Sequence, residues 1–238
     1  MLSLLAALGL AALPAAVLIV YFYRLDKAKP EPIGLIGRSV LYGFMAVFPA
    51  IGIEIALGAF LPKLPGLAGV FVEAFLVAGL VEESVKFFFL KRYIYKRPEF
   101  DERVDGIVYA ICVSLGFAFV ENFLYGYSDF GVLALRAFTS VPLHALASGV
   151  MGYYIGMSKI SKDGKPGSSG LYRGLGWAVF IHGIYDFFVL SGSFAALLVF
   201  PLLFIAFRVL KSMYRKALAA DAADSTISPY QNAEPPIL

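Results

Sequence analysis

Several ionisable side chains lie inside stretches of sequence that are otherwise apolar. The stretch VEESVKFFFL places Glu82, Glu83 and Lys86 among hydrophobic residues. Burying one such group in hydrocarbon costs roughly 2.5–3.5 kcal/mol even on insertion scales. The chain has two histidines, His144 and His182, and both also fall within apolar runs. These residue types can activate water, bind a metal ion or relay protons, so each is a candidate for chemistry inside a membrane.

The spacing of these groups predicts that several share a helix face, because residues four apart lie one turn apart on an α-helix. At a rise of about 1.5 Å per residue, His144 and Asp186 lie ~21 Å from the expected helix ends, and His182 ~15 Å. Glu82 lies ~12 Å and Glu121 ~24 Å from those ends, so these two fit a common level least well. The pairs at this spacing are Glu82 with Lys86, Phe117 with Glu121, and His182 with Asp186.

Such groups could hydrolyse an amide bond in two ways. A carboxylate can act as the general base that activates water, while a histidine stabilises the oxyanion or donates a proton. Alternatively, two histidines and a carboxylate could hold Zn²⁺ and leave one position for water. The chain contains neither H-E-x-x-H nor G-x-S-x-G, two common hydrolase motifs. The sequence leaves a role for Zn²⁺ open, and the candidate metal ligands are Glu121, His144, His182 and Asp186.

The elements that must position these residues are membrane-spanning helices. Of the 238 residues, 60% are hydrophobic, compared with about 45–50% in soluble domains. Separate apolar runs of about 20 residues indicate an all-α, polytopic membrane protein. The net charge of +3 is small, and no basic pattern indicates nucleic-acid binding. We expect seven spans, at 2–21, 41–61 (starting as early as 33), 68–90, 104–125, 131–157, 171–191 and 194–210.

The basic residues of the connections alternate along the chain and predict its orientation. Lys and Arg follow the first, third, fifth and seventh expected spans, whereas the other connections hold few. By the positive-inside rule, the N-terminus lies outside and the C-terminus in the cytoplasm. No basic residue precedes the first span, so we expect an uncleaved helix and not a signal peptide. The helical membrane domain covers 1–217, with its functional core at 68–191, and 218–238 form a disordered cytoplasmic tail.

Three motifs in order resemble those of a known family. They are E-E-x-x-K at "EESVK", F-x-x-x-E at "FAFVE" and H-x-x-x-D at "HGIYD", and His144 lies between the second and the third. This set, which covers about residues 70–190, resembles the PrsW family of intramembrane proteases. That family is distantly similar to CAAX prenyl endopeptidases and bacteriocin-processing (Abi) proteins. Lys86 and Glu121 stand where those proteins carry arginine and histidine, which favours the PrsW family.

The resemblance implies a multi-pass peptidase of the cell membrane. Its substrate would be a membrane-anchored protein with a single span, for which an anti-sigma factor is the family's example. The resemblance also implies that Asp186 is the partner of His182 and that Lys86 neutralises and orients the two glutamates. Whether a metal such as Zn²⁺ takes part is left open. The implied catalytic residues are Glu82, Glu83, His144 and His182, supported by Lys86, Glu121 and Asp186.

Other functions could use the same buried groups. A proton-coupled membrane carrier could relay protons through Glu82, Glu121 and the histidines, and a non-catalytic scaffold could retain them. Many carriers contain inverted repeats, but the sequence shows no internal repeat. Four further charged residues are more consistent with structural or interfacial roles, in which long side chains reach the membrane surface. They are Glu54, Glu73, Asp105 and Arg136.

Overall fold

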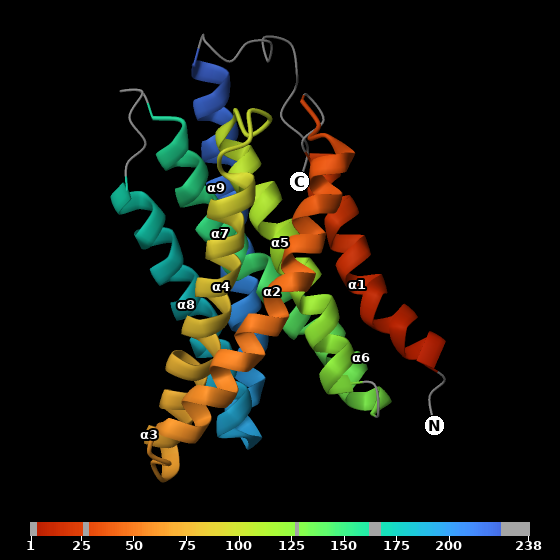
Figure 1. Ribbon diagram of the computed structural model, residues 1–238, viewed down its shortest axis with the longest axis vertical. Coiled ribbons are helices and arrows are strands. Elements are labelled where there is room, and N and C mark those ends of the chain that lie inside the picture. Colours follow the sequence, from red (N-terminus) through yellow and green to blue (C-terminus); the bar gives the residue numbers. More distant parts are fainter. Residues whose placement is uncertain (1–3, 26–28, 127–128, 162–167, 225–238) are drawn as a thin grey trace.

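The protein is an all-α bundle, as predicted (Figure 1). The computed structural model describes residues 4–25, 29–126, 129–161 and 168–224, and these ranges contain no strand. Six helical segments within them are long and apolar enough to cross a membrane. The long helices are α1 (Leu4–Leu25), α2 (Ile33–Phe60), α5 (Arg103–Gly126), α7 (Ser140–Lys159), α8 (Ser168–Ser191) and α9 (Val199–Ala223).

The third predicted span is helical but irregular, and it does not count among those six segments. Residues 66–94 are helical without interruption, and π-helical turns alternate there with α-helix. Such π-helical turns often occur at functional sites, because they change the direction in which the following side chains point. Seven spans and the orientation of the bundle therefore stay predictions. The helical stretch 66–94 consists of four parts, which are α3 (Gly66–Phe71), η1 (Val72–Gly79), α4 (Leu80–Phe89) and η2 (Leu90–Ile94).

The fifth predicted span is broken into α6 (Phe130–Phe138) and α7. The break falls at Thr139, whose backbone angles are φ −121° and ψ −62°. Pro142 explains it, because proline has no N–H to donate to the carbonyl four residues earlier. As a result α6 and α7 are separate helices, and His144 lies in the second turn of α7.

The C-terminal helix is longer than the sequence predicts. A short 3₁₀-helix, η3 (Ser193–Leu198), leads into α9, which continues to Ala223. The first six residues of the expected disordered tail, 218–223, are therefore helical. Residues 225–238 of that tail and 162–167 of the Gly- and Ser-rich connection lie outside the described residues.

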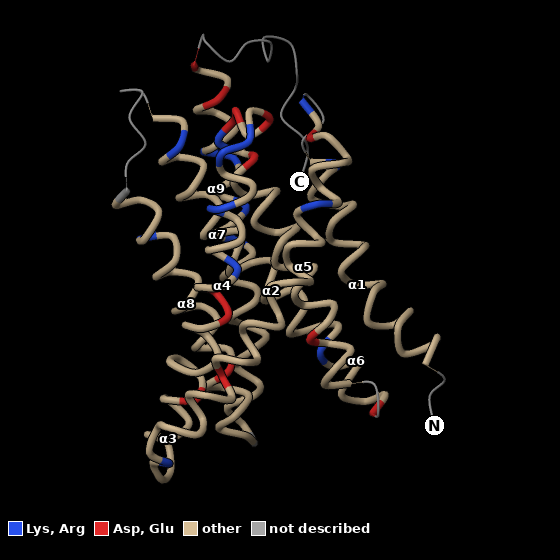
Figure 2. Tube along the Cα trace, viewed as in Figure 1, with Lys and Arg blue, Asp and Glu red and all other residues tan. Residues whose placement is uncertain are grey.

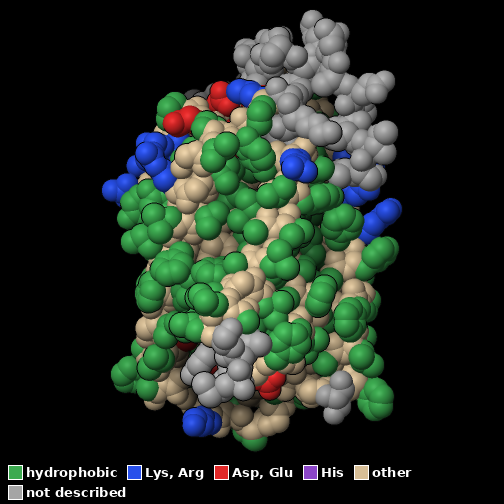
Figure 3. Space-filling model, turned by 90° about the vertical axis from the view of Figure 1, so that its right-hand side faces the viewer, with side chains coloured by type: hydrophobic (Ala, Val, Ile, Leu, Met, Phe, Trp, Pro, Cys, Tyr) green, Lys and Arg blue, Asp and Glu red, His purple; other side chains and the backbone are tan. Residues whose placement is uncertain are grey.

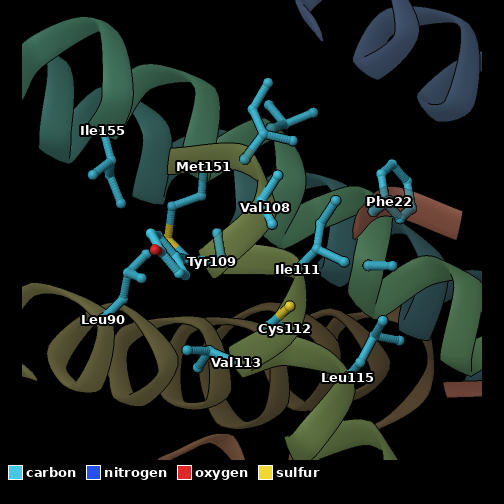
Figure 4. Packing of buried hydrophobic residues seen from close by; sticks show 14 of the residues in the cluster. Phe22, Leu90, Val108, Tyr109, Ile111, Cys112, Val113, Leu115, Met151 and Ile155 are labelled. Carbon is cyan, nitrogen blue, oxygen red and sulfur yellow. The ribbon is translucent and has the colours of Figure 1, made fainter. Parts of the chain in front are cut away.

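Helix α5 is the centre of the bundle and packs against α1, α2, α7 and α9. Nearly all its side chains are buried, and Figure 4 shows Val108, Ile111 and Leu115 in this core. Close packing against α7 requires small residues. A Cβ atom on Gly152 would collide with the backbone of Gly106. Helices α4 and α7 thus pack against α5, and α8 packs in turn against α7 and α4.

The surface is consistent with a membrane environment. Figure 3 shows hydrophobic side chains over most of one face, with charged ones mainly near its upper edge. Exposed apolar residues include Phe48, Phe88, Leu135 and Phe204. Most Lys and Arg gather at the end of the bundle where α1 and α9 end and α5 begins (Figure 2). We call this the basic end; it matches the alternation of basic connections along the sequence.

Candidate active site

The two histidines and the EESVK motif meet inside the bundle. The central cluster consists of Glu82, Glu83 and Lys86 from α4, His144 from α7 and His182 from α8. Each of these residues is at most 6% exposed. Figure 2 shows charged positions on α4 in the middle of the bundle. Three helices therefore contribute to one buried polar site.

Glu83 is fully occupied by hydrogen bonds. Its Oε1 accepts from Lys86 Nζ at 2.8 Å and lies 2.9 Å from Nδ1 of His182. Its Oε2 accepts from the hydroxyl of Ser148 at 2.9 Å. A second hydroxyl, that of Ser114, lies 2.9 Å from Ser148 and donates to the carbonyl of His144 at 2.7 Å. Glu83 thus ties α4 to α7 and α8, and it is 0% exposed.

Lys86 supplies the positive charge at the centre of the cluster. Its Nζ donates to Glu82 Oε2 at 3.1 Å as well as to Glu83. The same atom lies 2.9 Å from His144 Nδ1 and 4.1 Å from the centre of the Phe117 ring. The contact with both glutamates agrees with the role that the resemblance implies for Lys86.

His144 is held through both ring nitrogens. An ammonium group can only donate, so Nδ1 of His144 accepts from Lys86. The proton of the neutral ring is then on Nε2, which lies 2.6 Å from Glu121 Oε2. Glu121 therefore contacts His144 from the side away from the other central residues. Histidine–carboxylate contacts of this kind fix both the tautomer and the ring orientation.

His182 lies between two carboxylates. Its Nδ1 is held by Glu83, and its Nε2 lies 3.3 Å from Asp186 Oδ2. Asp186 is thus near His182, as the resemblance implies, but the closer carboxylate comes from another helix. The rings of His144 and His182 are perpendicular, with centres 4.9 Å apart.

Three atoms of the cluster converge on one point. Glu82 Oε2 lies 3.9 Å from His144 Nδ1 and 3.9 Å from His182 Nε2. One ligand atom from each residue falls within 4.8 Å of the others, a separation compatible with a shared metal ion. A tetrahedral zinc site with bonds of about 2.0–2.1 Å would place its ligand atoms ~3.4 Å apart, so small shifts would suffice.

The donor types also fit a metal. Two imidazoles and one carboxylate form a known catalytic zinc set, and each histidine has a carboxylate on its other ring nitrogen. Glu121, a ligand candidate from the sequence, lies in that outer position instead. Lys86 Nζ approaches two of the same atoms, so it would have to withdraw from His144 when a metal binds.

Two charged residues near the cluster were assigned other roles from the sequence. Arg136 of α6 lies 2.7 Å from Glu121, measured from Nη2 to Oε1, and its side chain is 19% exposed. Glu54 of α2 is close enough to interact electrostatically with Glu121, Lys86 and His182. Neither residue belongs to one of the three motifs, so no spacing indicated its place near the cluster. The signal that could have identified these two residues is a single charged side chain within an otherwise apolar stretch.

Comparison with known proteins identifies the family. The profile described as PrsW family intramembrane metalloprotease matches residues 31–210. The chain belongs to the PrsW family. It is 38% identical to Protease PrsW of Geobacillus kaustophilus over 204 residues, which cover 83% of this chain and 88% of that protein. It is also 38% identical to Protease PrsW of Oceanobacillus iheyensis, over 90% and 95% of the two chains. No solved structure matches the protein.

PrsW membership establishes the class of the protein. It is an intramembrane peptidase and a multi-pass protein of the cell membrane, as the motifs and the apolar runs predicted. Its substrate is a membrane protein in a lipid bilayer, as an intramembrane peptidase requires. The carrier hypothesis gains no support from these comparisons.

Proposed function

We propose that the central cluster is the catalytic centre and that Glu82, His144 and His182 act directly on the scissile peptide bond. The convergence of Glu82 Oε2, His144 Nδ1 and His182 Nε2 supports this proposal. The three residues come from three helices that are far apart in sequence. A buried arrangement that aims ligand or base atoms at one point has a chemical use that a simple ion pair lacks.

Glu82 is the glutamate of the pair that fits the role of general base. No hydrogen bond reaches its Oε1 from any described residue, whereas Glu83 uses both oxygens. Glu82 is also the more exposed of the two, at 6% against 0%. Glu83 instead positions Lys86, His182 and Ser148. Of the two adjacent carboxylates, Glu82 thus acts on the water and Glu83 holds the surrounding side chains in place.

The reaction proceeds by attack of water on the scissile carbonyl carbon. Glu82 accepts a proton from the water as its oxygen bonds to that carbon, and the proton then passes to the leaving nitrogen as the C–N bond breaks. His144 Nδ1, which carries no proton, accepts from the water, and His182 stabilises the oxyanion through Nε2. Glu121 and Glu83 keep the two rings oriented.

A metal ion bound at the same point is the alternative to this mechanism, and Glu82 would then be a ligand instead of the general base. Glu82, His144 and His182 would hold it, and Zn²⁺ is the ion whose ligand preferences fit best. Such an ion supplies a Lewis acid that polarises the carbonyl and makes bound water easier to deprotonate. Asp186, which lies 3.3 Å from His182 Nε2, is near enough to be a further ligand.

The substrate we propose is a membrane-anchored protein with one span, such as an anti-sigma factor cut at its first site. The support is the family resemblance together with the position of the cluster in the middle of the bundle. A substrate must therefore present an extended peptide bond within the membrane or close to its surface.

The test is cleavage of a tagged single-span protein by the purified enzyme in detergent or liposomes. Cleavage should occur with the wild-type protein, fall with a metal chelator and return when Zn²⁺ is added back. Cleavage that is insensitive to exhaustive chelation would remove the metal from the proposal. A wild-type protein that is folded but cleaves no membrane-anchored substrate would contradict the proposed function.

A further inference from the structure

Arg136 lies on the short helix α6 and reaches into the site from the side of Glu121. Its Nη2 is 2.7 Å from Glu121 Oε1, and the other oxygen of the same carboxylate is 2.6 Å from His144 Nε2. The carboxylate thus joins a guanidinium on one side to an imidazole on the other. We infer that Arg136 is a positioning residue that fixes His144 through Glu121; this inference rests on the proposed function of the central cluster.

The burial of these groups makes the contact with Arg136 consequential. The side chains of Glu121 and Arg136 are 14% and 19% exposed, and that of His144 is 1% exposed. A carboxylate in such a place needs a cationic partner, because water is not available to solvate it. Lys86 is already shared by Glu82, Glu83 and His144. Arg136 is therefore the cation in direct contact with Glu121 among the described residues.

Contacts with neighbouring residues fix helix α6 and thereby the position of Arg136. Asp129 caps its first turn by accepting from the N–H groups of Gly131 and Val132. Leu133, in the middle of the helix, is fully buried in a cluster with residues of α1. At the far end Thr139 accepts a hydrogen bond from Tyr185 of α8 at 3.0 Å. The Asp129 cap stabilises α6 itself, and the contacts of Leu133 and Thr139 with neighbouring helices set its position.

The guanidinium also has a defined orientation. It lies 4.7 Å from the centre of the Tyr125 ring, a cation–π contact that holds it over the last turn of α5. An arginine that reached for the membrane surface would instead lie extended and exposed. Tyr125 and Glu121 are four apart on one helix, so one guanidinium can contact both.

Arg136 and Glu121 therefore connect α6 to His144 in the central cluster. If Arg136 is removed, Glu121 loses its partner and can turn away from His144. Nδ1 of His144 would then no longer be held toward Glu82 and His182. The protein would keep its fold, because α6 is anchored by Leu133 and Thr139 independently of Arg136.

The experiment uses the full-length protein with ¹⁵N-labelled histidine. The chain has two histidines, so the spectrum contains two ring systems, and His182→Gln assigns them. We expect Arg136→Gln to shift the His144 ring signals and to leave those of His182 nearly unchanged. Arg136→Lys should restore them in part, since lysine keeps the charge but not the planar guanidinium. Arg173→Gln, a change at an exposed arginine of α8, is the matched control and should shift neither ring.

Kinetics of the same variants give a second readout. Arg136→Gln should lower kcat about 10–100-fold, the usual cost of losing an outer partner of a catalytic histidine, with KM changed much less. In a Glu121→Gln background the Arg136→Gln change should cost little more, because both act on His144 by the same route. Unchanged His144 signals, or losses that simply multiply in the double variant, would overturn the inference. If the wild-type protein cleaves no substrate, the proposed function fails, and the histidine spectrum still decides the role of Arg136.

Discussion

Two of the buried groups of charged side chains among the described residues, one at the basic end and one near the middle of the bundle, use their polar atoms differently. At the basic end, Asp221 of α9 meets the start of α5. Its carboxylate accepts from the backbone N–H groups of Arg103 and Val104 at 3.0 and 3.2 Å and from the Arg103 guanidinium at 2.9 Å. We call this contact the α5–α9 clasp. It caps α5, and its charges are matched within the fold.

The central cluster sets two carboxylates against one ammonium group, and some of its polar atoms are not used by the fold. Glu82 Oε1 has no hydrogen-bond partner among the described residues, and Glu82 Oε2 faces Nδ1 of His144 and Nε2 of His182 across 3.9 Å. Lys86 contacts Glu82, Glu83 and His144 through side chains alone, whereas backbone N–H groups donate to Asp221 in the clasp. The comparison teaches that buried charge alone does not mark a catalytic site. Atoms that converge on a shared point do.

The largest difference between the central cluster and the clasp is expected when His182 is replaced. We expect His182→Ala to lower kcat on the order of 10²–10⁴, because it removes a group that acts on the reacting atoms. The amount of folded protein in the membrane should stay close to wild type. Cleavage assays on size-exclusion-purified protein would measure this. Retention of most of the activity would place His182 outside the reaction and leave it a structural role like that of Asp221.

The clasp should show the opposite behaviour. Asp221→Asn leaves the buried Arg103 with a neutral partner, so we expect the free energy of unfolding to fall by about 3 kcal/mol. The kcat of the protein that remains folded should change less than about threefold. Denaturant titration in micelles, combined with cleavage assays on the folded fraction, separates the two effects. A large drop in kcat at full folding would show that the clasp is coupled to the site.

A smaller effect is expected at Lys86, whose Nζ lies against atoms that a metal would use. Lys86→Met removes this competing charge, so bound Zn²⁺ should be held at least about tenfold more tightly, since like charges repel strongly in a buried site. Activity should fall less than in His182→Ala. Metal content after dialysis against a graded chelator gives the affinity directly. Weaker metal binding in Lys86→Met would mean that the ammonium supports the ligand set and does not compete with it.

Much of the central cluster could be predicted from the sequence because its motifs lie on single helices. Glu82 and Lys86 are four apart, and this spacing alone predicts their contact. With the observed helix ends, Glu82, His144 and His182 lie ~18, ~22 and ~21 Å from the basic end, closer together than the expected ends implied. The larger differences in depth that the sequence implied came from errors in the predicted span boundaries and not from the motifs.

Contacts between helices could not be predicted, because sequence spacing does not fix which faces meet. Glu83 holds His182 more closely than Asp186 does, although Asp186 lies on the same helix as the histidine. Arg136 joins the site from α6, which ends before Thr139, whereas the sequence predicts one continuous span there. The π-helical turns before α4 likewise depend on packing that the apolar pattern of the span does not reveal.

The most direct test of the account is the rate of cleavage by Glu82→Gln beside Glu83→Gln, measured on the same purified substrate. Glutamine keeps the shape of Glu82 but cannot accept the proton, so kcat should fall on the order of 10²–10⁴ in protein that is fully folded. Glu83→Gln should instead reduce the yield of folded protein, because both carboxylate oxygens hold other residues. A Glu82→Gln protein that cleaves at nearly the wild-type rate would contradict the claim that the central cluster activates water through Glu82.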